Sequence, residues 1–266
     1  MANKDAGTKA PTTLSQRKDL KGNFLNFRGE HAGTFIYRIV SQDRLFELFD
    51  GRQNALVHPS KWDDPFENLI LNAKIKMPGG DTGDFGFRND LYGQCWTLHQ
   101  ASDAMWRIYS PNKLGVRVRT TIGRLAGSLS NCLGDWARQQ CFVGKVQYMT
   151  TPQMRSFGET FAAGHLSADA VARTLLVKRE AFKHEREVRL IYFEKDNTRH
   201  AEGVFRYALD PHKMIDQLMV DPRVPLDEFV SLKREIKYRT SFRKSIERST
   251  LYDPPTQLVL RFGSQD

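Results

Sequence analysis

Two hydrophobic periodicities run along the chain, one typical of strands and the other of helices. Alternating or short continuous apolar runs, rich in aromatic and β-branched residues, predict strands, because successive strand side chains point to opposite faces of a sheet. This pattern predicts strands within residues 34–40, 54–59, 91–99, 114–120, 141–149, 183–193, 204–209, 214–220 and 257–262.

Helical spacing and capping residues predict helices between these strands. Ser41 is suited to cap the first turn of a helix, and Gly51 is suited to end it. Asp64-Pro65 followed by Glu67 is the order expected at a helix start, with Asp64 as the N-cap. Helices are therefore predicted at residues 42–49, 103–109 (with Ser102 as cap), 121–133 and 167–183, and from Asp64 and Leu226 onward.

The spacing of these elements predicts the fold class. Many predicted strands are joined by connections too short for the helical crossover that parallel neighbours need. We therefore expect an α+β fold with a mixed, mostly antiparallel sheet and helices packed on it. The first 25 residues are polar and lack an apolar period, which predicts a flexible N-terminal arm at 1–25 and a single domain at 26–266.

Composition excludes several classes of protein. The chain is 40% hydrophobic and 11% aromatic, which is typical of a globular protein. Its three cysteines, Cys95, Cys132 and Cys141, have no C-x-x-C spacing, which argues against a disulfide framework and favours a reducing cytoplasm. The chain begins without the apolar run of a signal peptide, and it contains no apolar stretch of about 18 residues, so we expect no membrane association.

Net charge favours polyanionic partners. The 40 lysines and arginines exceed the 31 acidic residues and give a formal charge of +9, which suits a nucleotide or nucleic acid. The excess is concentrated in residues 233–248, where a solvated helix face is the more common explanation and a nucleic-acid patch the alternative. Composition leaves the oligomeric state open.

Familiar catalytic motifs are absent from the sequence. There is no G-x-G-x-x-G, no P-loop, no G-x-S-x-G and no H-E-x-x-H, which argues against a Rossmann half, a P-loop enzyme, a serine hydrolase and a zincin. The seven histidines form no pair at metal-ligand spacing, so we expect no bound metal.

Polar residues inside the predicted strands are the remaining candidates for chemistry. Arg38 lies in an aromatic strand, where burial is costly unless it finds an anion, either a structural carboxylate or a bound phosphate. Glu185, Glu187 and Arg189 alternate along one predicted strand and would share a face. They would form either a charge ladder on a solvent-exposed edge or the lining of a cleft.

Five segments carry a resemblance to a known family. In order along the chain they are "YRI", "NALVHPSKWDDPFEN", "QCWTLHQASDAMWRIYS", "GVRVRT" and "FKHEREVRLIYF". Over roughly residues 34–195 the sequence resembles the bacterial domain of unknown function 2971 family, which carries an Asp-Pro-Phe-Glu turn, a Trp-x-x-Tyr helix and a late Glu-x-Glu-x-Arg strand. Asp63 stands where asparagine is common in that family. The resemblance implies a shared fold and no settled activity.

The order of the strand-borne polar residues also resembles that of ADP-ribosyltransferases. Their cleft takes an Arg or His, then a Ser, Thr or aromatic residue, then a Glu pair from three strands. This resemblance implies NAD as substrate, with Glu187 as catalytic carboxylate, Glu185 as its acceptor-side partner, and Arg38, Tyr37, Thr97, Trp96 and His99 as NAD-binding residues. A carboxylate bonded to the ribose would stabilise the cationic transition state of glycosidic cleavage. A nucleic-acid, nucleotide or protein acceptor and a toxin or phage-defence role would follow.

Two other functions remain open from the residues. A metal-dependent nuclease would gather Mg²⁺ with Asp63, Asp64, Glu185 and Glu187. A non-enzymatic module for nucleic acid or protein would instead use the basic segment 233–248.

Overall fold

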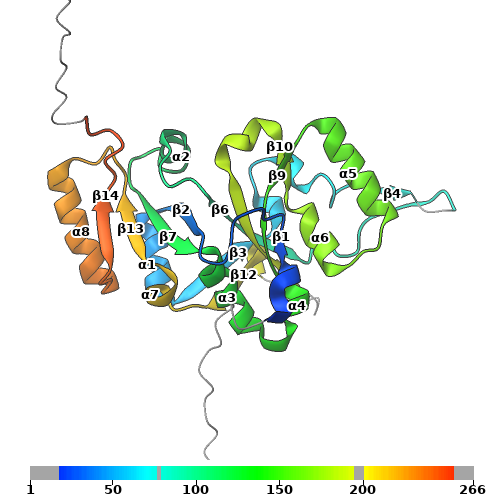
Figure 1. Cartoon of the computed structure of the whole chain (residues 1–266), viewed down its shortest axis with the longest axis horizontal. Coiled ribbons are helices and arrows are strands. Elements are labelled where there is room, and N and C mark those ends of the chain that lie inside the picture. Colours follow the sequence, from blue (N-terminus) through cyan, green and yellow to red (C-terminus); the bar gives the residue numbers. More distant parts are fainter. Residues whose placement is uncertain (1–17, 77–78, 195–200, 255–266) are drawn as a thin grey trace, which may run out of the picture.

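The computed structural model describes residues 18–76, 79–194 and 201–254, and it confirms the predicted α+β class (Figure 1). Ten strands form one mixed, mostly antiparallel sheet, in which eight follow the order β1-β8-β11-β6-β2-β7-β13-β14. The other two, β3 and β12, branch from β6. Along the order of the sheet the strands span Phe24–Leu25, Cys141–Lys145, Glu187–Phe193, Leu91–Thr97, Phe35–Ser41, Gly115–Thr121, Gln217–Val220 and Ser245–Arg248, with β3 at Gln53–Val57 and β12 at Val204–Ala208.

The sheet forks along β6, and this fork positions the site described below. On one side β6 pairs along its full length with β11. On the other side it meets β2 only where Tyr37 lies opposite Thr97, and β3 only where Val57 lies opposite Gly93. Because β2 and β3 diverge from β6, a gap opens between them along the middle of this strand.

Strand β11 is central in the sheet. It pairs with β6 on one side and β8 on the other, and all seven of its residues are buried. Leu190 packs into one apolar cluster and Ile191 into a second on the opposite face. Of the two alternatives for this strand, the charge ladder on a solvent-exposed edge is therefore wrong.

Most of the predicted helices are confirmed. The structure contains α1 at Gln42–Gly51, α2 at Asp103–Tyr109, α3 at Ile122–Leu133 and α8 at Leu226–Thr240, with Ser41 and Ser102 capping α1 and α2 as predicted. The end of α1 differs from the prediction, because Arg52 and not Gly51 takes the left-handed conformation, with a φ of 47°. Asp64 caps the 3₁₀ helix η4, Pro65–Asn68, by accepting from the backbone N–H of Phe66.

The predicted helix 167–183 is wrong in its second half. Helix α6 spans only Ala168–Thr174, and the chain then forms strand β10, Val177–Arg179, and the 3₁₀ helix η6, Glu180–Glu185. The predicted strand 141–149 is likewise divided, because β8 ends at Lys145 and β9, Gln147–Met149, pairs with β10 in a separate sheet. The apolar run before Lys178 fits either period, and its pairing with β9 decides the outcome.

Shorter elements complete the described part of the chain. Helix α7 takes up the start of the predicted strand 214–220, which therefore begins at Gln217, and the predicted strand 257–262 lies outside the described residues. None of the helices in the three described ranges is long and apolar enough to cross a bilayer. The remaining elements are β4 (Ile75–Lys76), β5 (Thr82–Gly83), α4 (Ala137–Gln140), α5 (Thr151–Ala163), α7 (Pro211–Met214), η2 (Lys18–Asn23), η3 (Pro59–Lys61), η5 (Gly134–Trp136) and η7 (Ala201–Gly203).

The predicted boundary of the N-terminal arm at residue 25 is wrong. Helix η2 and strand β1 occupy residues 18–25, and β1 adds to the sheet beside β8. Leu25 is buried, and the side-chain amide of Asn23 donates to the carbonyl of Cys141 at 2.7 Å. These contacts make residues 18–25 part of the folded structure. Residues 1–17 lie outside the described ranges.

Candidate active site

A cleft of about 500 Å³ opens where β6 separates from β2 and β3. Its walls come from β2, β3, β6, α2, β10 and η6 and from the turn that carries Trp62, Asp63 and Asp64. This volume lies in the range of pockets that hold small molecules and cofactors. The fork in the sheet therefore creates a space for a ligand between strands that are far apart in sequence.

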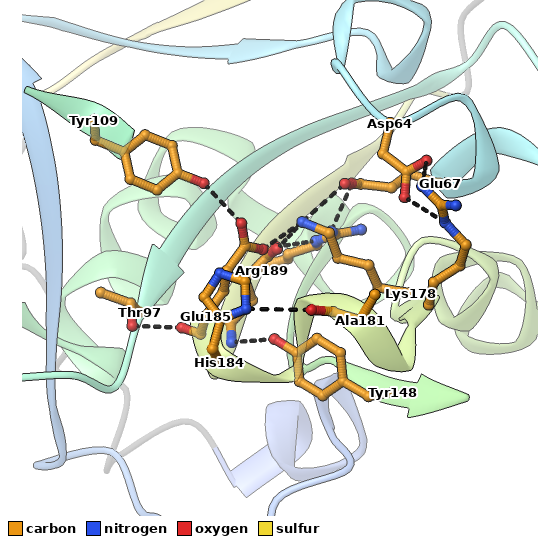
Figure 2. Close-up of polar contacts among 12 residues, drawn as sticks. Asp64, Glu67, Thr97, Tyr109, Tyr148, Lys178, Ala181, His184, Glu185 and Arg189 are labelled. Atoms are coloured by element: carbon orange, nitrogen blue, oxygen red, sulfur yellow. Dashed lines mark hydrogen bonds and ion pairs between the residues drawn. The ribbon is translucent and has the colours of Figure 1, made fainter. Parts of the chain in front are cut away.

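Three carboxylates converge on one lysine at the floor of the cleft (Figure 2). Lys178 Nζ lies 3.0 Å from Glu67 Oε1 and 2.5 Å from Glu187 Oε1, and it also forms an ion pair with Glu185 Oε2. All four side chains are buried. Strand β10 delivers the lysine, while η4, η6 and β11 deliver the three acids.

Arg189 is the second cation of this cluster. Its Nε lies 2.7 Å from Glu187 Oε2, its Nη2 lies 2.6 Å from Glu67 Oε2, and its Nη1 donates to the carbonyl of Leu175 at 2.7 Å. The residue is fully buried, and its guanidinium lies 4.5 Å from the centre of the Trp62 ring. Every nitrogen of this arginine thus has an acceptor, as a buried charge requires.

Gly93 makes room for the indole ring that covers Arg189. A Cβ atom at this position would lie 2.6 Å from Trp62 Cζ2, closer than van der Waals contact permits. The absence of a side chain on β6 therefore allows Trp62 to lie against the strand.

The charges of the cluster do not balance when every carboxyl is ionised, because three acids face two cations. Burial and the adjacent Glu187 raise the pKa of Glu185 to about 7. Burial also opposes ionisation of Glu187, but Arg189, the hydrogen bond with Glu185 and the charge of Lys178 together lower its pKa below the ordinary value. At neutral pH Glu187 is therefore ionised, while Glu185 is close to its titration point.

Glu185 lies outside the strand to which the sequence pattern assigned it. It ends η6, and Arg186 then takes a left-handed conformation with a φ of 44°, so the simple alternation from Glu185 to Glu187 is broken. The hydroxyl of Thr97 donates to the backbone carbonyl of Glu185 at 2.6 Å, which ties η6 to β6. Across the cleft, the Tyr109 hydroxyl donates to Glu185 Oε1 at 3.2 Å.

Arg38 presents the opposite situation from Arg189. It lines the cleft from β2, and its guanidinium makes no ion pair or hydrogen bond with any residue in the described ranges. Burial lowers the pKa of Arg38, although an arginine stays charged at neutral pH. A partly desolvated cation without a carboxylate is a candidate site for an anionic ligand.

Three of the other four predicted NAD-binding residues line the cleft, and the fourth does not. Tyr37, Trp96 and Thr97 line the cleft, and Trp96 donates its indole N–H to Gln94 at 2.8 Å. His99 is not among the lining residues, and its Nε2 lies 2.7 Å from the carbonyl oxygen of His184.

Three of the four acids proposed for a metal-dependent nuclease are paired with cations of the protein. Asp64 lies 2.9 Å from Arg179 Nη2, whereas Glu185 and Glu187 are bound to Lys178. Within the described residues, no three side chains of metal-binding type form a group that could hold an ion. The arrangement gives these carboxylates protein partners in the positions where a metal would need them free.

Four residues of the site were missed by sequence reasoning: Trp62, Glu67, Tyr109 and Lys178. The sequence pattern assigns Glu67 to a helix cap and Lys178 to the predicted helix 167–183. The available signal was a lysine directly after the apolar pair Leu176 and Val177, since a lysine buried in such a run needs an acidic partner.

The basic segment 233–248 lies away from the cleft, on the second half of α8 and on β14. Several of its cations have partners in the protein: Arg239 pairs with Asp50, Arg248 with Asp253, and Lys244 donates to backbone carbonyls. Arg234, Lys237 and Arg243 remain exposed.

Comparison with known proteins gives a limited result. No protein-family model and no curated protein matches the chain. Among solved structures it is similar to Thermus sp. 2.9 DarT in complex with NAD⁺, at 12% identity and a TM-score of 0.37, covering 83% of this chain and 97% of that one. The same figures for identity and TM-score hold for Thermus sp. 2.9 DarT in complex with ADP-ribosylated ssDNA, with 83% and 96% covered. A TM-score of this size is too low to establish a shared fold, and membership of the domain of unknown function 2971 family stays a prediction.

Proposed function

We propose that the chain is an ADP-ribosyltransferase-like enzyme that cleaves NAD and transfers ADP-ribose to an acceptor. The observation that carries the proposal is the combination, in one cleft, of an arginine that has no carboxylate partner among the described residues with a buried pair of glutamates whose pKa values are driven apart. Two carboxyls in different protonation states can serve two roles in one reaction.

Arg38 would bind the pyrophosphate of NAD. Its planar guanidinium suits two phosphate oxygens, and the anion would supply the partner that the described residues do not. Tyr37 and Trp96 border the same space and would contact the flat nicotinamide ring. Thr97 would support this wall through its bond to the Glu185 carbonyl.

Glu187 would stabilise the transition state. When the bond between nicotinamide nitrogen and ribose C1′ breaks, its electron pair leaves with nicotinamide and positive charge develops on the ribose. The Glu187 carboxylate stays ionised beside Lys178 and Arg189, and the lone pairs of its oxygens that these two cations leave free would accept from a ribose hydroxyl and stabilise that charge.

Glu185 would act as general base for the acceptor. A new bond then forms between C1′ and an oxygen or nitrogen of the acceptor, whose proton passes to the Glu185 carboxylate. A pKa near the working pH is suited to this transfer. The net charge of +9 favours a nucleotide or nucleic acid as acceptor over an uncharged one. A role in toxin action or phage defence accompanies this proposal.

The test is direct. The purified protein is incubated with NAD labelled in the nicotinamide ring, with and without single-stranded DNA, RNA or a protein mixture, and free nicotinamide is measured. We expect release that increases with one acceptor class and persists in chelator. Release that requires Mg²⁺, or phosphodiester cleavage without nicotinamide, would instead support the nuclease hypothesis.

A further inference from the structure

Tyr109 reaches the carboxylate cluster from the opposite wall of the cleft. It is the last residue of α2, and its side chain extends toward Glu185 (Figure 2). The helix that carries it is firmly held, because Trp106 is buried and its carbonyl accepts from Arg223 Nη2 at 3.1 Å. Tyr109 itself is 45% exposed, so its ring contributes little to the apolar core. A core-packing role therefore does not explain its position.

The two oxygens of Glu185 have different partners. Oε2 faces inward to Lys178, while Oε1 accepts the Tyr109 hydroxyl at 3.2 Å on the cleft side. The tyrosine thereby directs one carboxylate oxygen toward the space that a substrate would occupy.

The groups facing Glu185 come from several elements. Lys178 on β10 favours its charged form, and Glu187 on β11 disfavours it. Tyr148 on β9 lies nearby, but its hydroxyl accepts from the backbone N–H of Glu187 at 2.8 Å, and within the described ranges it forms no hydrogen bond with a carboxylate. Burial and the neighbouring carboxylates raise the pKa of Tyr109 above its ordinary value, so it stays a proton donor through the neutral range.

We infer that Tyr109 is a positioning residue for Glu185. Its hydroxyl orients Glu185 Oε1 into the cleft and stabilises the ionised carboxylate by donating a hydrogen bond to it. This inference rests on the proposed function for its catalytic consequence, but not for its effect on Glu185. A hydrogen bond to a charged group favours the charged form, so its loss moves the titration of the carboxyl to higher pH.

The test uses Tyr109→Phe, with Tyr148→Phe as the matched control. Removing one donor to a carboxylate is expected to shift its titration upward by about one pH unit. If the ionised form is active, nicotinamide release by Tyr109→Phe at pH 7 falls about fivefold and recovers at pH 9. In Tyr148→Phe the rate can change, but the midpoint of the pH profile stays in place.

A direct measurement separates this inference from the proposed function. The side-chain carboxyl of Glu185 is titrated by ¹³C NMR in the wild type and both variants, and Glu185→Gln assigns its signal. An upward shift in Tyr109→Phe alone supports the inference even where no NAD is cleaved. An unshifted carboxyl in the folded variant overturns it even where NAD is cleaved. If Tyr109→Phe does not fold, Tyr109→Leu must show the same upward shift, and its absence overturns the inference equally.

Discussion

Arg38 and Arg189 lie in strands of the same sheet, but their surroundings are opposite. Arg189 is fully buried, and Glu67, Glu187 and the Leu175 carbonyl accept from its nitrogens. Arg38 faces the cleft, where no described residue pairs with its guanidinium. The comparison shows that a buried arginine with all its partners supports structure, whereas a partly desolvated arginine without them is available to a ligand.

The largest expected effect tests the structural half of this comparison. Replacing Arg189 with methionine leaves the buried carboxylates of Glu67 and Glu187 with Lys178 as the one cation they still share among the described residues. We expect a loss of about 3–5 kcal/mol in the free energy of unfolding. Urea denaturation followed by fluorescence measures it, with Arg38→Met as the control that loses an equal charge. Similar losses in both variants would contradict the distinction drawn between the two arginines.

The next largest effect concerns Glu185 in the cleft. Glu185→Gln removes the proposed general base for the acceptor, and acceptor-dependent nicotinamide release is expected to fall about 100-fold or more. Because Glu185 is only partly ionised at neutral pH, the substitution should change the free energy of unfolding by about 1 kcal/mol. Glu187→Gln is a poorer test, because it also breaks the bonds to Lys178 and Arg189. Unchanged turnover in Glu185→Gln would remove this residue from the mechanism.

Arg38→Gln tests the ligand-binding half of the comparison. Loss of a charge-assisted bond to phosphate is expected to weaken NAD binding about 10- to 100-fold, with little change in stability. Calorimetric titration with NAD measures the affinity, and Arg44→Gln is the control, since Arg44 is an exposed arginine paired with Glu47 nearby in sequence. Equal affinity in Arg38→Gln and the wild type would exclude Arg38 as the anchor.

The smallest expected effect concerns the contact between Gly93 and Trp62, whose ring lies over Arg189. A methyl group introduced by Gly93→Ala would collide with Trp62, and the ring must move. Such overpacking typically costs about 1–3 kcal/mol. Thermal unfolding of Gly93→Ala measures the cost. In the double variant with Trp62→Ala, part of the stability lost through Gly93→Ala should be recovered, because the ring that the methyl group meets is gone. No recovery in the double variant would mean that some other contact makes Gly93 necessary.

Local order along the chain was predictable where side chains act on their own backbone. Ser41, Asp64 and Ser102 cap the elements that follow them, because a short polar side chain meets the free N–H groups within three residues. The strand of Glu187–Phe193 was equally clear from its apolar run. These features depend on neighbours that are near in sequence.

The site was only partly predictable. Glu185, Glu187 and Arg38 were noticed because charged residues in or beside apolar strands are unusual, and all three line the cleft. Lys178 was hidden, because the period of Leu175, Leu176 and Val177 does not distinguish a helix from a short strand. Its strand exists through pairing with β9, which no local pattern reveals.

The sequence by itself determined the α+β class, the caps, the central apolar strand and the types of charged residue available for chemistry. Only the tertiary structure decided which of those charges meet. Tertiary packing brings Glu67 of η4 against Lys178 and Arg189, which lie more than 100 residues further along the chain, and the fork at β6 leaves Arg38 outside that group. The reason is physical: periodicity records which face a side chain takes, whereas the partner it finds there depends on which strands become neighbours.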